Sequence, residues 1–402
     1  MLSARRLAST AGGGRFALDF GSRSAPAVVS LAWLRDHDPN HLHPTSQQRQ
    51  FDTAELGGTS ALLEASDVSV VEGKLRVRWA DRSASVFDGA WLADNAPREG
   101  ADAASAAFRA ARRSPTWGLP AARPWRTMTK DAVPHVSARS VPVGAPASDV
   151  SPAARRVLDA LAVTGVALVT DMPSSAAETE RIVRALVGPP RETFYGEMWD
   201  TAPRNLEDVN DTAYTKDALD GHTDTTYLAD SPGLQCFNCV AQSGPPAAKD
   251  EGATKLLDAL HLASELRRVA PDAYRFFCET PLVFHHIERG VNTRHTAPVF
   301  RVDPASGELL QMRYNAYDLA PLSYLTPDQV DEFYAHNAAL ARVVRDPANM
   351  ALCKLGVGEM IVVQNHRVLH GRTAFKGYRN LVGCYVGMDD WVMRARAAAS
   401  AG

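Results

Sequence analysis

Two residues with metal-binding side chains, His222 and Asp224, stand two positions apart in the run GHTDTTYL. Side chains of an extended segment alternate between its faces, so these two would point to the same side. A third ligand is predicted at His370, because the segment GEMIVVQNHRVLHG that contains it reads as a strand. Two histidines and a carboxylate leave three positions of an octahedral ion open, which is the ligand set of non-haem Fe(II) oxygenases. The pair alone also occurs by chance, and any of the 12 histidines could be a core or surface residue.

An arginine nine residues after His370 strengthens this interpretation. Arg379 lies in FKGYRNLVGCYV and could project from the following strand into the same barrel mouth. A guanidinium binds a carboxylate through two parallel hydrogen bonds, which suits the distal carboxylate of 2-oxoglutarate while its keto-acid end chelates iron. Thr254, in GATKLLDAL, could donate a further hydrogen bond. The alternatives are a surface salt bridge for Arg379 and an ordinary strand position for Thr254.

Strands and helices that could position these residues are visible along the chain. Short strands with turns are expected at VSVVEG (68–73), LRVRWAD (75–81), SVFDGAWL (85–92) and VALVTDM (166–172). Helices are expected after the N-cap Ser151 with Pro152 behind it, at 178–188, and at 325–346 after Thr326 and Pro327.

These patterns predict an α+β chain with a large β core. We expect a small β-rich N-terminal domain at 19–95 and a catalytic domain with helical insertions at 146–402. The connector at 96–145 is rich in Ala, Pro, Ser and Arg and has little periodicity.

The charge, hydropathy and cysteine content of the chain limit the kinds of molecule and environment that it is expected to meet. The chain has 402 residues, and its 43 basic and 46 acidic residues give a net charge of −3, so neither nucleic acid nor an anionic membrane surface is expected as a partner. No apolar run is long enough to predict a transmembrane helix. Five cysteines are too few and too scattered for a secreted disulfide framework, and we expect the CxxC pair at Cys236 and Cys239 to be reduced.

The first residues, MLSARRLASTAGGGRF, carry three arginines and several hydroxyl side chains but no acid before Asp19. This composition is typical of a mitochondrial transit segment, which we place at 1–18, and it predicts localisation in the mitochondrial matrix. The alternative is a disordered basic terminus on a cytoplasmic protein.

Long motifs across the chain resemble the family of trimethyllysine and γ-butyrobetaine dioxygenases, which are Fe(II)/2-oxoglutarate oxygenases. They are AWLRDH (32–37), ETFYGEMWD (192–200), DTAYTKDALDGHTDTTYL (211–228), MRYNAYD (312–318), and NHRVLHGR with GYRNLVGCY (365–385). The resemblance implies a double-stranded β-helix, or jelly roll, as the catalytic domain. It also implies a homodimer that acts on a small molecule, with ascorbate as reductant. The short spacing from His370 to Arg379 is more similar to the trimethyllysine branch.

The resemblance also implies residues that bind the substrate. A trimethylammonium group cannot donate hydrogen bonds, so its recognition requires an aromatic cage. Tyr195, Trp199, Tyr214 and Tyr385 match the cage positions, although each aromatic residue alone is more often part of a core. Asn315 matches a position that holds polar groups of the substrate. Asp211 could pair with the α-ammonium of trimethyllysine, which butyrobetaine lacks, although an aspartate also often caps a turn.

Two departures from the family pattern affect the metal predictions. Where the family has zinc-binding cysteines, the run WLRDHDPNHLHPT places Asp38, Asn40 and His43, and without thiolates we expect no structural zinc. His366, four residues before His370, is expected in a supporting or surface position and not as a ligand.

Three functions remain open from the sequence. The first is 3-hydroxylation of Nε-trimethyllysine, the second is the same chemistry on γ-butyrobetaine, and the third is a non-catalytic binder of methylated ammonium. The complete ligand set and Arg379 favour an enzyme.

Overall fold

The computed structural model divides the chain into two compact units, Met1–Arg113 and Ser114–Gly402, and each is considered by itself. It describes all residues except 1, 8–13, 22–24, 51, 53, 55–63, 99–101, 114, 115, 117, 145–148, 203–215, 245–249, 289, 401 and 402. Within this described part, no helix is long and apolar enough to span a membrane.

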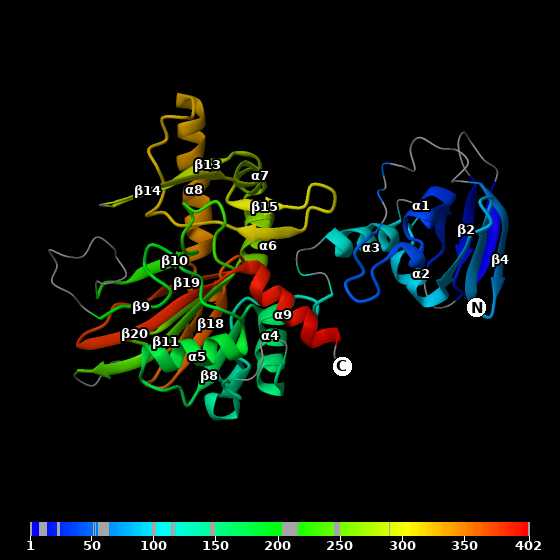
Figure 1. Cartoon of the computed structure of the whole chain (residues 1–402). Coiled ribbons are helices and arrows are strands. Elements are labelled where there is room, and N and C mark those ends of the chain that lie inside the picture. Colours follow the sequence, from blue (N-terminus) through cyan, green and yellow to red (C-terminus); the bar gives the residue numbers. More distant parts are fainter. Residues whose placement is uncertain are drawn as a thin grey trace. The chain divides into compact units, whose positions relative to one another are not determined.

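The N-terminal unit contains two small antiparallel sheets and three helices (Figure 1). One sheet has the order β1-β2-β3 and the other β4-β5-β6. Alternation explains the second sheet, since Leu75, Val77 and Trp79 of β5 are buried while the residues between them are exposed. The strands are β1 (Ser3–Leu7), β2 (Arg15–Asp19), β3 (Ala27–Ser30), β4 (Ala65–Val71), β5 (Lys74–Trp79) and β6 (Ala84–Asp88), and the helices are α1 (Leu31–Asp36), α2 (Gly89–Asn95) and α3 (Ala103–Arg113).

The predicted boundaries of this unit differ from the structure. β1 and β2 pair along their whole length, and Phe16 and Leu18 are buried in the core, so the folded unit begins before residue 19. The interval 96–145 is not a separate connector, because α3 belongs to the N-terminal unit and β7 (His135–Ser137) belongs to the larger one. The targeting role of the first residues stays a prediction.

A polar network occupies the place where the family pattern has zinc-binding cysteines. Asp38 is buried and accepts a hydrogen bond from Ser85 Oγ at 2.5 Å, and the same hydroxyl accepts from Trp79 Nε1 at 2.6 Å. The Arg35 guanidinium lies over the Trp79 ring, 4.9 Å from its centroid, and pairs with Asp81. These contacts join α1 to the second sheet. The expectation of no zinc stays a prediction.

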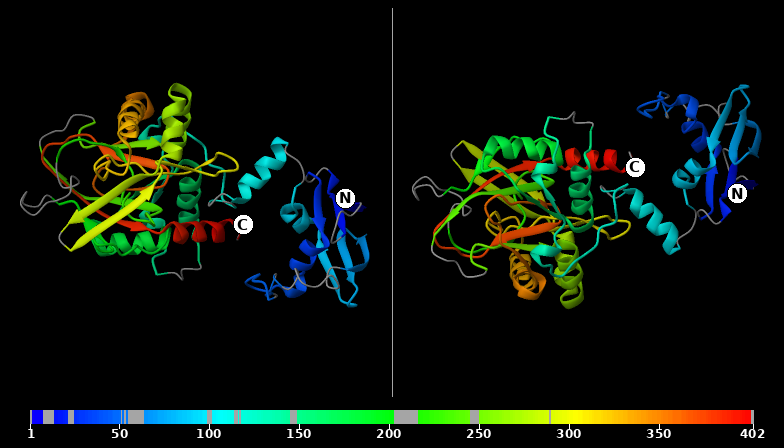
Figure 2. Two further views of the ribbon diagram at one scale, coloured as in Figure 1. Left: turned by 90° about the horizontal axis from the view of Figure 1, so that it is seen from above. Right: turned by 90° about the horizontal axis from the view of Figure 1, so that it is seen from below.

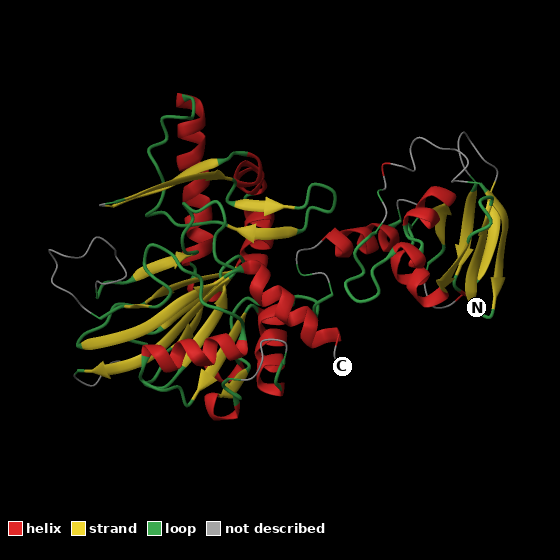
Figure 3. Ribbon diagram, viewed as in Figure 1, coloured by secondary structure: helices red, strands yellow, loops and turns green. Residues whose placement is uncertain are grey.

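Two facing sheets form the centre of the larger unit, as expected for a jelly roll (Figure 3). The six-stranded sheet has the order β7-β8-β18-β11-β20-β9, and the four-stranded sheet has the order β10-β19-β12-β17. The strands are β8 (Val166–Thr170), β9 (Trp199–Asp200), β10 (Leu219–His222), β11 (Leu234–Ser243), β12 (Thr254–Asp258), β17 (Ala351–Cys353), β18 (Met360–Gln364), β19 (Val368–Arg372) and β20 (Tyr378–Val386). The predicted α+β class is confirmed.

Strand β18 shows why both faces of the six-stranded sheet are buried. Met360 and Val362 pack into the cluster that faces helices α4, α5 and α9, whereas Ile361 and Val363 pack between the two sheets. A strand covered on both faces reads as a continuous apolar run. Helix α8 lies on the opposite side of the sheets from α5 and α9 (Figure 2). The helices are α4 (Pro152–Thr164), α5 (Ala176–Leu186), α6 (Ala259–Val269), α7 (Pro271–Glu279), α8 (Pro327–Arg345) and α9 (Met388–Ser400).

Two hairpins accompany the main sheets: β13 (Leu282–Glu288) with β14 (Val291–Ala297), and β15 (Phe300–Val302) with β16 (Leu309–Met312). Short 3-10 helices in the described part of the chain include η2 (Pro39–His41), η5 (Lys130–Ala132), η6 (Ala138–Ser140) and η9 (Pro347–Asn349).

Two of the three predicted helix starts are confirmed by their caps. Ser151 Oγ accepts from the Ala154 amide before α4. Thr326 and Gln329 form a reciprocal capping box at the start of α8. Helix α5 begins earlier than predicted, after the N-cap Ser175.

The run 358–371, predicted as one strand, contains two. β18 belongs to the six-stranded sheet and β19 to the four-stranded sheet, so the chain crosses between the layers at 365–367. This crossing carries His370 into the sheet that also contains β10.

Candidate iron and 2-oxoglutarate site

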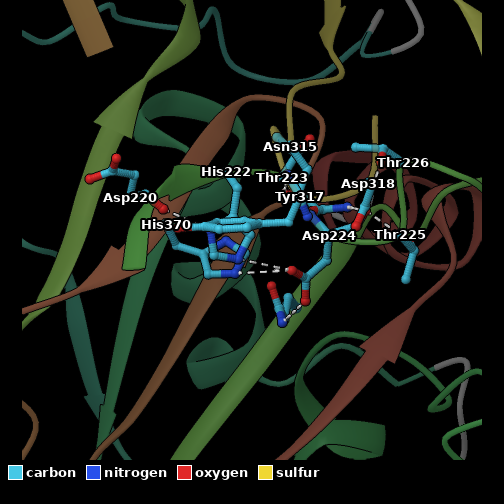
Figure 4. Close-up of polar contacts among 12 residues, drawn as sticks. Asp220, His222, Thr223, Asp224, Thr225, Thr226, Asn315, Tyr317, Asp318 and His370 are labelled. Atoms are coloured by element: carbon cyan, nitrogen blue, oxygen red, sulfur yellow. Dashed lines mark hydrogen bonds and ion pairs between the residues drawn. The ribbon is translucent and has the colours of Figure 1, made fainter. Parts of the chain in front are cut away.

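Antiparallel pairing of β10 with β19 brings the two predicted histidine ligands together. His222 lies directly opposite His370 in this ladder. The Nε2 atoms of His222 and His370 lie 3.3 Å and 3.4 Å from Asp224 Oδ1 (Figure 4). Donors bound at about 2.1 Å at neighbouring corners of an octahedron are about 3 Å apart, so these spacings fit one divalent ion. Within the described residues, these three side chains form the only group of at least three potential ligands that could hold a metal ion.

Nε2 is the ring nitrogen that faces Asp224 Oδ1 in both histidines. His222 Nδ1 lies 2.8 Å from the Asp220 carbonyl oxygen and donates to it, which fixes the ring. Burial lowers the pKa of His370, as expected for a ring that packs 5.2 Å from Phe237. Burial also acts to lower the pKa of His222, but the Asp224 carboxylate, the Asp220 carbonyl and the charge of Asp318 together raise it.

The second oxygen of Asp224 is held by Tyr385, which was predicted as a cage residue, and by Gln235, which was not predicted. Tyr385 donates its hydroxyl to Oδ2 at 2.7 Å, and Gln235 Nε2 donates to the same atom. Asn365 fixes the backbone of Asp224 by accepting from its amide at 2.8 Å and donating to its carbonyl at 3.1 Å. Burial acts against ionisation of Asp224, yet the adjacent His370 and His222 hold its pKa well below the usual range. Oδ1 is therefore oriented and ionised as a metal ligand.

A cavity of about 420 Å³ opens beside these three side chains. Its walls come from both sheets, from hairpin β13–β14 and from the loop that follows β16. The predicted residues that line it are Tyr195, Trp199, His222, Asp224, Thr254, Asn315, His370, Arg379 and Tyr385.

Arg379 presents a buried cation to this cavity. Its side chain is 6% exposed, and its Nε and one terminal nitrogen have no partner within the described part of the chain. Burial lowers the pKa of the guanidinium, but arginine stays charged near neutrality. A buried cation with unpaired donors requires an anion, and a carboxylate of 2-oxoglutarate fits this donor pattern. Thr254 is buried at the wall of the same cavity.

Aromatic side chains form one wall of the cavity, which we call the aromatic wall. Trp199 lies 5.8 Å from the Tyr385 ring, and the Tyr195 hydroxyl lies 3.1 Å from that of Tyr227. His286 of hairpin β13–β14 packs 4.9 Å from the Tyr227 ring. Tyr227 and His286 were not predicted, although Tyr227 stands three residues after Asp224 in the motif itself.

Other predicted residues have different outcomes. Asn315 lines the cavity, where its Oδ1 accepts from the Tyr317 amide at 3.0 Å. Asp211 and Tyr214 lie outside the described residues. His366 is buried beside Ser231, and burial lowers its pKa to about 4, so it supports the structure and is not a surface residue or a ligand.

Gly383 makes room for Trp199. Both residues are paired across β20 and β9, and a β-carbon at position 383 would overlap the indole ring. Arg379, Leu381 and Tyr385 line the cavity from alternate positions of β20, and Gly383 continues this face. Because residue 383 has no side chain, the Trp199 ring can lie directly against β20.

We expect Gly383→Ala to displace Trp199. Overpacking of this kind should lower the free energy of unfolding by about 1–3 kcal/mol, measured by urea denaturation. The KM for a substrate that binds against the aromatic wall should rise as well. Adding Trp199→Phe should restore stability but not substrate affinity, because the smaller ring fits beside a methyl group. A stable Gly383→Ala enzyme with unchanged KM would contradict this role.

Known proteins resemble the chain over most of its length. Residues 128–385 match the family described as Taurine catabolism dioxygenase TauD, TfdA family. "Trimethyllysine dioxygenase, mitochondrial" of Rattus norvegicus is 31% identical over 371 residues, with 90% of this chain and 81% of the relative covered. The protein of that name from Gallus gallus is 32% identical over 373 residues, with 91% and 82% covered. "Gamma-butyrobetaine dioxygenase" of Pseudomonas sp. (strain AK-1) is 28% identical over 371 residues, with 90% and 88% covered.

Proposed function

Because the chain belongs to the TauD, TfdA family and is an Fe(II)- and 2-oxoglutarate-dependent dioxygenase, we propose that it hydroxylates Nε-trimethyllysine at C3. O2 and 2-oxoglutarate are consumed and succinate and CO2 are released. This reaction is the first step of carnitine biosynthesis. The relatives named trimethyllysine dioxygenase are more similar to the chain than the γ-butyrobetaine dioxygenase, which supports this substrate.

The observation that carries the chemistry is the convergence of the metal-binding residues and Arg379 on one cavity. His222, Asp224 and His370 would hold Fe(II), which supplies activation of O2 when it is bound with the cosubstrate. The chain's own residues orient these ligands: Tyr385 and Gln235 hold the Asp224 carboxylate, and Asp220 fixes His222. Arg379, with Thr254 nearby, would bind the distal carboxylate of 2-oxoglutarate.

The aromatic wall supports a quaternary ammonium substrate. Tyr195, Trp199 and Tyr385 would offer ring faces to the methyl groups, and Tyr227 adds a ring next to Tyr195. Burial, together with the nearby Asp224 charge, raises the pKa of Tyr385 well above its ordinary value. Tyr385 therefore stays a neutral hydrogen-bond donor to Asp224 while its ring borders the cavity. Tyr385 would thus both hold the Asp224 carboxylate and contribute a ring to the cage, which adds a role to the predicted one.

A substrate panel tests the proposal. Purified enzyme with Fe(II), 2-oxoglutarate and ascorbate should release succinate with trimethyllysine, and at a much lower kcat/KM with γ-butyrobetaine. Preference for butyrobetaine would favour the second family activity. Tight binding of either compound without succinate release would favour a non-catalytic binder. The ionised Asp224 argues against such a binder, as do the two Arg379 nitrogens that have no partner among the described residues.

The proposal extends to the cellular setting. The rat and chicken relatives are named mitochondrial, which supports a mitochondrial location for this protein. A homodimer and ascorbate as reductant are part of the same proposal and rest on the family resemblance.

A further inference from the structure

The chain turns sharply directly after the candidate ligand Asp224. Thr225 has a φ of 55°, in the left-handed region that a β-branched residue rarely adopts. The Leu228 amide donates to the Thr225 carbonyl at 3.0 Å and closes the turn, and Thr225 Oγ1 donates to the Asp224 carbonyl at 2.8 Å. Such a conformation costs free energy and persists only where the surrounding structure holds it. The turn directs Asp224 to the two histidines and Tyr227 to the cavity, so the contacts that hold it also position both side chains.

A buried arginine holds the far side of this turn. Arg313 follows β16, and its Nη1 donates to the Thr226 carbonyl at 2.5 Å and to the Leu228 carbonyl at 2.8 Å. Its Nη2 donates to the Ala229 carbonyl at 3.4 Å and to Ser231 Oγ at 3.5 Å. Burial lowers the pKa of Arg313 to about 10, so the guanidinium stays charged near neutrality. These acceptors all belong to the loop that follows the metal-binding motif, and none of them is a carboxylate.

The next residue holds the chain on the other side of Asp224. The Thr223 amide donates to the Tyr314 carbonyl at 2.8 Å, and the Tyr314 amide donates to Thr223 Oγ1 at 2.9 Å. Thr223 directly precedes Asp224, so residues 313 and 314 hold the backbone both before and after this carboxylate. Both residues belong to the motif MRYNAYD, in which only Asn315 was predicted to have a functional role.

A second buried arginine makes similar contacts away from the cavity. Arg394 of α9 donates to the Ala185 carbonyl at 2.6 Å and to the Leu186 carbonyl at 3.2 Å, at the end of α5. None of these three residues lines the cavity. Arg313 and Arg394 therefore share burial and carbonyl acceptors, but only the acceptors of Arg313 lie in the turn next to Asp224. A comparison of the two arginines separates positioning of the site from general stabilisation.

We propose that Arg313 is a positioning residue of the metal site, which holds the strained turn at Thr225 and so keeps Asp224 facing the two histidines. This inference rests on the proposed function, in which Asp224 binds the metal. Without the guanidinium, Thr225 can relax toward an ordinary backbone conformation, which rotates the backbone next to Asp224. Asn365 still holds the Asp224 backbone, so metal binding should weaken and not disappear.

The test measures the Fe(II) dissociation constant of each apoprotein by anaerobic equilibrium dialysis, together with its stability to urea. Arg313→Met should raise this constant about 10- to 100-fold, the range typical of residues that orient metal ligands. Arg313→Lys keeps the charge but cannot reach several carbonyls at once, so its constant should lie between those of wild type and Arg313→Met. The lysine variant also serves if the methionine variant does not fold. The matched control, Arg394→Met, should lose stability but bind Fe(II) as wild type does.

Relief of the backbone strain gives a second measurement. Asparagine adopts the left-handed conformation more readily than threonine, so Thr225→Asn should restore most of the Fe(II) affinity that Arg313→Met loses. Wild-type Fe(II) affinity in the folded Arg313 variants would overturn the inference, as would an equal loss in Arg394→Met or the absence of rescue by Thr225→Asn. Each of these outcomes leaves the proposed function intact. Wild-type protein that binds no Fe(II) would instead overturn the proposed function together with this inference.

Discussion

His370→Ala should lower succinate formation by three decades or more, equivalent to about 4 kcal/mol or more of transition-state stabilisation. The reason is that His370 would supply one of three protein ligands from β19, opposite His222. With two ligands left, both close to β10, the ion would lack a donor on the opposing strand. Turnover measured as succinate release, together with Fe(II) content after desalting, checks this expectation.

A neighbouring histidine provides the control for this variant. His366 is also buried, but its Nε2 lies 3.1 Å from both Ser231 Oγ and the Ser231 carbonyl oxygen and faces no metal ligand. His366→Gln keeps a hydrogen-bonding group there and should retain Fe(II) binding. His370→Gln, which leaves less empty space than alanine, guards against a folding defect. Near wild-type turnover in a folded His370 variant would show that the ligand assignment is wrong.

The sequence predicts those parts of the site in which side chains two, four or six positions apart along an extended segment point to the same side. His222 is the last residue of β10 and Asp224 follows it by two positions in the loop, so the predicted convergence of the pair holds although the strand ends between them. Arg379 and Tyr385 share a face of β20 because they are six apart. Local rules of this kind need no knowledge of the partner strand. The pairing of His222 with His370 needed one further idea, that two distant segments meet in one sheet.

Residues that depend on register could not be predicted. Gln235 reaches Asp224 because β11 lies next to β20 in the six-stranded sheet, and the sequence does not state strand order. Asn365 reaches the Asp224 backbone because the chain crosses from one sheet to the other at that point. An apolar run covered on both faces gives no sign of such a crossing, so the sequence predicts a single strand at 358–371 where the structure has two.

The predicted start of the N-terminal domain at residue 19 differs from the structure for another reason. Basic and hydroxyl residues at 3–7 resemble a targeting segment by composition, and composition cannot distinguish a free terminus from an edge strand. In the structure this segment pairs with β2 and has mostly exposed side chains, as an edge strand tolerates.

Arg379→Ala should raise the KM for 2-oxoglutarate roughly 30-fold or more, because loss of a buried charge pair costs on the order of 2–5 kcal/mol. The guanidinium is buried at the cavity wall, and its unpaired nitrogens have no other described partner. The KM for the amine substrate should change far less, since the aromatic wall remains. Steady-state assays with each compound varied in turn measure both constants.

Two further variants distinguish a carboxylate-binding role from general damage. Arg379→Lys keeps the charge but loses the paired donors, so its KM for 2-oxoglutarate should lie between those of wild type and Arg379→Ala. Arg372 is the other arginine that lines the cavity, and its Nε already donates to the Asp217 carbonyl at 3.0 Å. If Arg372→Ala raised the KM for 2-oxoglutarate and Arg379→Ala did not, the distal carboxylate would be bound by Arg372. If Arg379→Ala alone raises this KM, the Arg379 guanidinium on β20 binds the distal carboxylate and orients the cosubstrate toward the metal ligands.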